Sequence, residues 1–174
     1  MKNLEIKARF KWSHEVDGIL EEINAKFETA EIQTDTYFNV NNGRIKIRER
    51  QGEDAQMIQY FREDKADVKE CRYSLVHVKN PESVKSILTR EHGIREIVNK
   101  HREVWIWENV RIHFDKVKKL GEFIELEAMV DGDNTKEICE NRIRELMVKL
   151  DIKKHNLIEQ SYIDLLENLE NMQS

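Results

Sequence analysis

The chain has little proline, glycine or cysteine and no long apolar run. One Pro and six Gly in 174 residues are too few for a collagen-like or disordered protein. No apolar stretch is long enough to span a bilayer, and the N-terminus lacks a signal-peptide core. The two cysteines, Cys71 and Cys139, fit no metal-binding spacing, and free thiols indicate a reducing compartment. We therefore expect a cytoplasmic protein without a membrane partner.

An excess of positive charge is also missing. Charged residues make up 36% of the chain, but the formal net charge is -5. This balance excludes a globally basic nucleic-acid binder, so we expect no nucleic-acid partner. The length suits one domain with a substantial core.

Several familiar catalytic motifs are absent as well. The sequence has no glycine-rich phosphate loop, no dinucleotide-binding fingerprint, no His-x-x-x-His pair and no nucleophile elbow. An enzyme with this sequence must therefore depend on carboxylates and cations.

Charged and apolar residues alternate in several segments. Glu5 and Lys7 are separated by Ile6, and Glu125 and Glu127 by Leu126. Because neighbouring side chains point to opposite faces of a strand, each segment has one apolar and one ionised face. The repeated residue types suggest that several ionised faces surround one highly charged ligand.

The pattern predicts about eight strands, short turns and inserted helices. Strands are expected at about 3–10, 33–39, 44–50, 56–62, 72–79, 97–107, 110–115 and 123–130. Helices are expected after Ser13, with an apolar stripe that reaches Phe27, after Asn80-Pro81, at about 135–150 and at about 157–170. This order indicates an α+β protein whose mainly antiparallel sheet is able to close into a barrel.

The acidic residues are candidate metal ligands. Glu125 and Glu127 share a strand face, Glu5 repeats the pattern, and Asp115 lies on the preceding strand. Carboxylate oxygens suit Mg²⁺ and Mn²⁺, which also bind substrate phosphate. A solvent-facing sheet with alternating charge is the alternative explanation.

The basic residues repeat this geometry. Arg44, Lys46 and Arg48 share one strand face, and Lys100 and Arg102 share another. Like charges on one face repel unless an anion neutralises them, and guanidinium groups bind phosphate bidentately. A triphosphate would satisfy many of these groups together. Pairing with Glu5 and Glu125 in a lattice of ion pairs is the alternative.

With these segments the chain resembles the CYTH domain, the triphosphate tunnel metalloenzyme superfamily of class IV adenylate cyclases and thiamine triphosphatases. The similarity is greatest to the class IV adenylate cyclase-like branch and extends over nearly the whole chain. Its motifs are Leu4–Lys7, Gln33–Phe38, Gly43–Glu49, Asn109–Asp115, Leu120–Glu127 and Ser161–Leu166.

The resemblance implies a single CYTH-like domain over residues 1–174, built as an eight-stranded antiparallel tunnel with flanking helices. It implies catalytic roles for Lys7 and Asp115, and a metal site formed by Glu5, Asp115, Glu125 and Glu127. It implies phosphate binding by Lys7, Arg44, Lys46, Arg48, Arg62, Lys79, Lys100 and Arg102. The family's first-strand motif is Glu-x-Glu-x-Lys, and here Asn3 replaces its first Glu.

The function expected from the resemblance is Mg²⁺- or Mn²⁺-dependent chemistry on inorganic triphosphate, ATP or thiamine triphosphate. Hydrolysis is favoured because it needs only a triphosphate site. Cyclisation of ATP to cyclic AMP and pyrophosphate is the second reading. Binding without turnover is the third, and Asn3 makes it credible. Either a monomer or a homodimer is compatible with the sequence.

Overall fold

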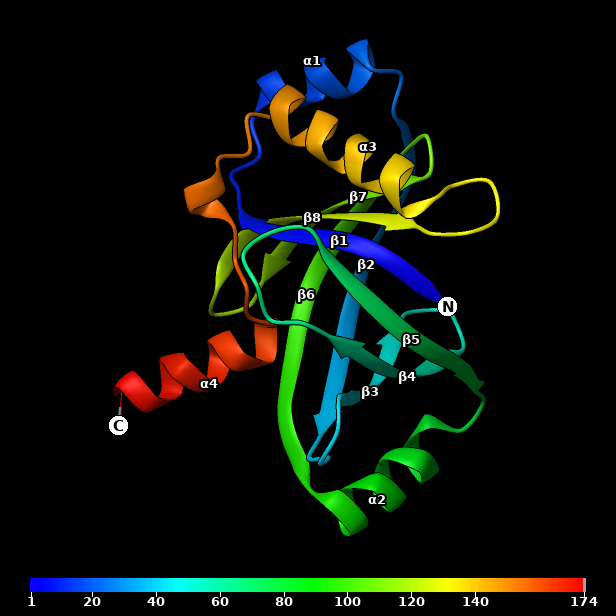
Figure 1. Cartoon of the computed structure of the whole chain (residues 1–174). Helices are drawn as coiled ribbons and strands as arrows, with labels where there is room; N and C mark the ends of the chain where they lie inside the picture. The colour runs from blue at the N-terminus through cyan, green and yellow to red at the C-terminus, as the bar shows by residue number, and fades with distance from the viewer. Residues whose placement is uncertain (174) are drawn as a thin grey trace.

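Eight antiparallel strands close into a barrel (Figure 1). In the computed structural model, which describes residues 1–173, neighbours follow the order β1-β5-β4-β3-β2-β6-β7-β8. The strands are β1 Lys2–Arg9, β2 Lys26–Phe38, β3 Arg44–Arg50, β4 Ala55–Arg62, β5 Lys69–Val78, β6 Ile94–Trp107, β7 Val110–Val117 and β8 Gly121–Met129. The predicted α+β barrel is therefore confirmed.

Helices cover parts of the outer surface. They are α1 His14–Glu22, α2 Pro81–His92, α3 Lys136–Lys149 and α4 Tyr162–Gln173, with a short 3₁₀ helix at Lys154–Asn156. Helices α1 and α3 pack over β1, β7 and β8, whereas α2 lies at the other end of the barrel near β3 (Figure 1). Helix α4 contacts β6. No helix within residues 1–173 has the length and apolar character needed to cross a membrane.

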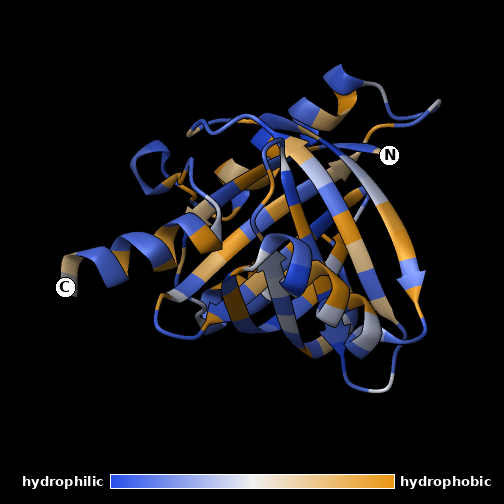
Figure 2. Ribbon diagram, turned by 90° about the horizontal axis from the view of Figure 1, so that it is seen from below, coloured by the Kyte–Doolittle hydropathy of each residue, from blue (hydrophilic) through white to orange (hydrophobic). Residues whose placement is uncertain are grey.

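The main core lies outside the barrel wall, beneath α1 and α3. Hydrophilic and hydrophobic residues alternate along the strands (Figure 2), so the apolar faces turn outward and the charged faces turn inward. The apolar residues of β1 and β8 in this core are Leu4, Ile6, Ala8, Ile124, Leu126 and Ala128. Burying each large aliphatic side chain contributes about 1.5–3 kcal/mol. Packing of the helices therefore stabilises a barrel whose interior is polar.

Helix α2 begins where the sequence predicts. The side chain of Asn80 accepts a hydrogen bond of 3.1 Å from the backbone N–H of Ser83, and Pro81 occupies the first turn. Gly93 ends the helix with a φ of 75°, a left-handed conformation that glycine adopts without steric cost. Ser13 precedes α1, but its side chain makes no capping hydrogen bond.

The predicted start of the second strand is wrong. β2 begins at Lys26 rather than Gln33, because residues from Lys26 onward pair with β6. Phe27 consequently belongs to this strand and not to the apolar stripe of α1. Its side chain is 53% exposed, and its ring lies 5.4 Å from that of Trp105. This end of β2 is mostly exposed, so it lacks the alternation that reveals a half-buried strand.

Candidate active site

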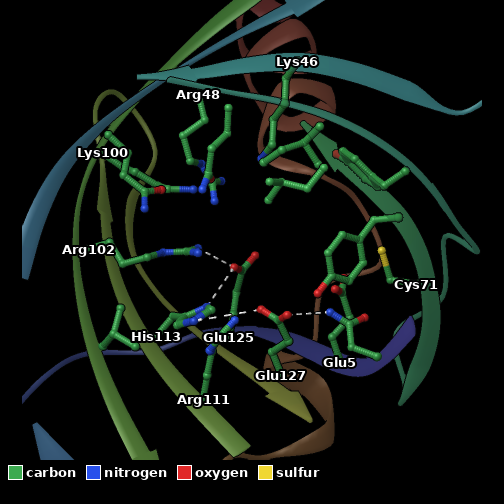
Figure 3. Close-up of a pocket in the computed structure, with 18 of the residues that line it drawn as sticks. Glu5, Lys46, Arg48, Cys71, Lys100, Arg102, Arg111, His113, Glu125 and Glu127 are labelled. Atoms are coloured by element: carbon green, nitrogen blue, oxygen red, sulfur yellow. Dashed lines mark hydrogen bonds and ion pairs between the residues drawn. The ribbon is translucent and has the colours of Figure 1, made fainter. Parts of the chain in front are cut away.

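The barrel encloses a charged cavity of about 580 Å³ (Figure 3). Inward-facing residues from all eight strands line it, together with Ser161 and Tyr162 near the C-terminus. Small-molecule sites commonly have volumes of about 300–1,000 Å³. The cavity therefore has the size of a ligand-binding site, and its chemistry follows from how the charged side chains are paired.

Asp35 anchors one group of cations. Its carboxylate, which is 1% exposed, accepts hydrogen bonds of 2.7 and 2.8 Å from the Arg48 guanidinium and one of 2.8 Å from Lys46. Lys100 lies 3.6 Å from the same carboxylate. Burial by itself would raise the pKa of Asp35, but Arg48, Lys46 and Lys100 hold that pKa well below its usual range.

One carboxylate does not neutralise these three cations, Lys46, Arg48 and Lys100. Burial and the nearby Arg48 lower the pKa of Lys46 to about 7. Burial and the nearby Arg102 lower the pKa of Lys100 to about 8. Both shifts reflect ammonium groups that are removed from water and repelled by a neighbouring guanidinium group. This corner of the cavity is therefore suited to an anion.

A second group surrounds Asp115. The Arg102 guanidinium donates to both of its carboxylate oxygens, at 2.6 and 2.5 Å, and to Glu125 at 2.5 Å. The hydroxyl of Tyr162 donates to Asp115 at 2.7 Å. Asp115 is buried and does not line the cavity, whereas Arg102 and Glu125 do. The geometry places Asp115 behind Arg102, where it orients the guanidinium.

Lys7 and Arg62 complete the basic lining. The Lys7 ammonium lies 3.1 Å from Glu125 and 3.6 Å from the centre of the Tyr162 ring. Burial is the main reason that the pKa of Lys7 is lowered. Arg62 forms an ion pair of 3.0 Å with Glu5. These contacts bring cations from β1 and β4 to the same cavity as those from β3 and β6.

Glu5 and Glu127 stand directly opposite each other on β1 and β8. The Asn3 amide donates to Glu127 at 2.7 Å, and its own oxygen is buried without a hydrogen-bond partner. His113 lies 4.0 Å from Glu127. Within residues 1–173, Glu127 forms no ion pair with a lysine or arginine. Glu127 is thus a cavity carboxylate whose charge no lysine or arginine of the described residues neutralises.

The donor chemistry of this region fits Mg²⁺ or Mn²⁺. No cluster of three His, Cys, Asp or Glu side chains is already arranged as a metal site among the described residues. Mg²⁺ usually binds one or two carboxylates and completes its shell with water and substrate phosphate. Glu5, Glu127 and the unpartnered oxygen of Asn3 offer such hard donors in the same cavity as the lysines and arginines.

The structure brings together most of the residues singled out in the sequence. Those that line the cavity are Glu5, Lys7, Lys46, Arg48, Arg62, Lys100, Arg102, Glu125 and Glu127. Arg44 instead lines a second cavity of about 370 Å³, where it pairs with Asp64 and Asp164. Lys79 is exposed just beyond the end of β5 and lines neither cavity.

Sequence reasoning missed two residues of the site. Asp35 shares strand parity with Gln33 and Tyr37, which face the cavity, and this alternation is the signal that could have identified it. Tyr162 belongs to an amphipathic segment, and nothing in its local pattern indicates that its hydroxyl reaches Asp115.

Comparisons with known proteins agree with this architecture. The CYTH domain model matches residues 1–162. A Methanocaldococcus jannaschii protein named "Putative adenylate cyclase MJ0240" is 27% identical, and the match covers 95% of this chain and 98% of that protein.

Two solved structures are similar in fold. The PH1012 protein of Pyrococcus horikoshii superposes with a TM-score of 0.83 at 22% identity, covering 94% of this chain and 98% of that one. HpAC1 of Hippeastrum superposes with a TM-score of 0.65 at 12% identity, covering 95% of each chain. With a family model that spans nearly its whole length, the chain belongs to the CYTH domain family.

Proposed function

We propose that the cavity binds a triphosphate together with Mg²⁺ or Mn²⁺ and that the protein is a triphosphate hydrolase. The observation that carries this proposal is the sharing of the single buried carboxylate of Asp35 by Lys46, Arg48 and Lys100. The resulting excess of positive charge faces a cavity with the volume of a small-molecule site. A polyphosphate supplies the missing negative charge.

The basic residues have complementary roles in this proposal. Arg48 and Arg102 are held in place by Asp35 and Asp115, so their guanidinium groups are preoriented and offer their remaining N–H groups to phosphate oxygens. Lys46 and Lys100 add point charges from β3 and β6, and Lys7 adds one from β1. Prearranged positive charge of this kind stabilises the charge that develops during phosphoryl transfer.

The acidic residues would hold the metal. Glu5 and Glu127 are the first candidates, because they face each other and Glu127 lacks a lysine or arginine partner within residues 1–173. Glu125 lies beside them, but Lys7 and Arg102 already engage its carboxylate. A bound divalent ion supplies Lewis-acid stabilisation of phosphoryl oxygens. The Asn3 amide donates a hydrogen bond that orients the Glu127 carboxylate, and His113 lies 4.0 Å from it.

Two other readings have their own support. The Methanocaldococcus jannaschii relative is named as an adenylate cyclase, whereas HpAC1 is described as having a dominant triphosphatase activity. Cyclisation would use the same cations, with a ribose hydroxyl in place of water as nucleophile. Asn3 removes one acidic group from the metal region, which supports a binding protein without turnover. Hydrolysis makes the fewest demands on the cavity.

A product assay tests the proposal. Purified protein is incubated with Mg²⁺ or Mn²⁺ and, separately, with inorganic triphosphate, ATP and thiamine triphosphate, and the products are resolved. We expect metal-dependent release of orthophosphate, abolished by a chelator. Cyclic AMP with pyrophosphate would instead establish a cyclase. Binding of these compounds without any product would overturn both enzymatic readings.

A further inference from the structure

His113 is a buried histidine on the cavity side of β7. Its side chain is 6% exposed, it lines the cavity, and it stands directly opposite Glu125 on β8. One ring nitrogen, Nδ1, lies 3.8 Å from Glu125, and the other, Nε2, lies 4.0 Å from Glu127 (Figure 3). Nδ1 is buried without a hydrogen-bond partner within residues 1–173, which is rare for a polar atom in a folded protein. The imidazole therefore lies between two carboxylates, one at each ring nitrogen.

Both carboxylate oxygens of Glu125 are already engaged. Its Oε1 lies 3.1 Å from the Lys7 ammonium, and its Oε2 accepts a hydrogen bond of 2.5 Å from Arg102. The Nδ1 of His113 faces the same Oε2. Histidines that bind metals usually direct their second ring N–H at a carboxylate, which fixes the tautomer and the orientation of the ring. Glu125 is therefore placed to orient His113 rather than to bind a metal itself.

Glu127 offers an oxygen on the side of His113. Its Oε1 accepts the hydrogen bond of 2.7 Å from Asn3, whereas its Oε2 is the atom that lies 4.0 Å from Nε2 of His113. Arg111 stands opposite Glu127 on β7 but forms no ion pair with it among the described residues. A neutral imidazole whose proton is on Nδ1, facing Glu125, presents the lone pair of Nε2 towards Glu127. One nitrogen donor and one oxygen donor therefore converge beside the cavity.

The spacing of these two donors fits a single metal ion. Ligands held at about 2.1 Å from one ion lie about 3 Å apart in neighbouring positions and about 4.2 Å apart in opposite positions. The 4.0 Å between Nε2 of His113 and Oε2 of Glu127 lies inside this range. Both residues line the cavity, so water and phosphate oxygens have access to complete the metal shell.

We propose that His113 binds the divalent metal through Nε2, together with Glu127, and that Glu125 orients the imidazole. This inference rests on the proposed metal-dependent triphosphate site and adds a nitrogen ligand to it. Mg²⁺ takes oxygen ligands, whereas imidazole is a ligand of transition-metal ions. The nitrogen donor therefore favours Mn²⁺ over Mg²⁺ at this site.

Pulsed electron paramagnetic resonance of bound Mn²⁺ tests the inference without turnover. Wild-type protein is freed of metal with a chelator and loaded with Mn²⁺, with and without a methylene-bridged analogue of inorganic triphosphate. A nitrogen bound directly to Mn²⁺ modulates the electron spin echo. We expect this modulation in the wild type, and we expect its pattern to change when histidine is labelled with the heavy nitrogen isotope. The labelled protein needs no substitution and identifies histidine as the source.

Two variants locate the nitrogen. His113→Gln keeps a polar side chain but removes the imidazole, so the modulation should disappear while Mn²⁺ still binds through Glu127. His77 is the other histidine in the described lining of the cavity, so His77→Gln is the matched control and should keep the modulation. If His113→Gln does not fold, retention of the isotope-sensitive modulation in His77→Gln assigns the nitrogen to His113, and its loss there overturns the assignment.

Calorimetric titration measures the preference between metals. Mn²⁺ and Mg²⁺ are titrated separately into wild-type protein, His113→Gln and His77→Gln, each with the same analogue present. His113→Gln should lower the ratio of Mn²⁺ affinity to Mg²⁺ affinity by at least about tenfold, because the glutamine oxygen suits both ions. His77→Gln should leave this ratio unchanged.

The outcomes separate this inference from the function on which it rests. Bound Mn²⁺ without nitrogen modulation in the wild type, or modulation that persists in His113→Gln, would overturn the role of His113 and leave the proposed triphosphate site standing. An unchanged ratio of affinities in folded His113→Gln would overturn the preference for Mn²⁺. Failure of Mn²⁺ to bind, with or without the analogue, would overturn both the inference and the metal-dependent function.

Discussion

The hydroxyl of Tyr162 donates a hydrogen bond of 2.7 Å to Asp115, a residue 47 positions earlier in the chain. The same carboxylate holds Arg102, and the Tyr162 ring lies beneath the Lys7 ammonium. Tyr162 is also the first residue of α4. The start of the C-terminal helix is therefore part of the cavity and orders two of its cations.

Tyr162→Phe tests this connection. The substitution keeps the ring but leaves Asp115 without one of its buried donors, so we expect a loss of about 1.5–3 kcal/mol in the free energy of unfolding. Urea denaturation measures this loss. Tyr73→Phe is the matched control, because within residues 1–173 the Tyr73 hydroxyl donates its hydrogen bond to the Met129 sulfur, at 3.4 Å, and to no carboxylate. Equal losses in the two variants would contradict the role of Tyr162.

Asp35→Asn removes the charge that Lys46, Arg48 and Lys100 share. Leaving buried cations unpaired is expected to destabilise the fold by about 3–5 kcal/mol. Inorganic triphosphate should then raise the melting temperature of the variant more than that of the wild type, because the ligand replaces the lost charge. Glu49→Gln, which breaks an ion pair with Lys85 on the outer surface, should show no such gain.

The shifted lysines predict opposite effects of pH on stability and binding. The pKa values of Lys46 and Lys100 fall from 10.5 to about 7 and about 8 on folding. Between these values and 10.5 the unfolded chain binds more protons than the folded protein does. The contribution of these lysines to the free energy of unfolding therefore rises with pH. Triphosphate affinity should fall over the same range, because the lysines lose the positive charge that attracts the phosphates. A loss of interaction energy equivalent to one pKa unit weakens binding about tenfold.

Titrations with inorganic triphosphate from about pH 6 to about pH 9 measure the change in affinity, and thermal melts over the same range measure the change in stability. Lys46→Arg keeps its charge throughout this range and should flatten the binding profile. A profile that is identical in Lys46→Arg would show that other groups are responsible.

Glu127→Gln tests the metal role. The variant keeps the size of the side chain but loses the carboxylate charge that Mg²⁺ or Mn²⁺ requires, so we expect loss of at least about 100-fold in metal-dependent turnover. Glu122→Gln on the exposed outer face of β8 is the control and should retain the wild-type rate. Wild-type turnover by Glu127→Gln would remove Glu127 from the metal site.

Asn3→Glu restores the acidic residue that the family motif contains. It replaces the amide that donates to Glu127 with a third carboxylate, so repulsion should destabilise the metal-free protein by about 1–3 kcal/mol. Mn²⁺ should raise the melting temperature of this variant more than that of the wild type, since an added oxygen ligand strengthens binding. Equal Mn²⁺ stabilisation would place the metal elsewhere.

Local sequence pattern was sufficient for much of the fold. Alternation along β1, β3 and β8 identified the strands, and it correctly assigned Leu126 to one face and Glu125 and Glu127 to the other. Asn80 and Pro81 identified the start of α2. These features depend on residues close together in the chain, and period two is itself a local property.

The tertiary structure decided which charges meet. Only closure of the barrel brings Lys100 to Asp35 and Tyr162 to Asp115, and only the placement of each strand end separates Arg44 from the main cavity and leaves Lys79 exposed. The sequence by itself determined that each strand has a charged and an apolar face. Whether the charged face turns towards water or towards a ligand depends on strand order and register around the ring, which are set by contacts between residues far apart in the chain.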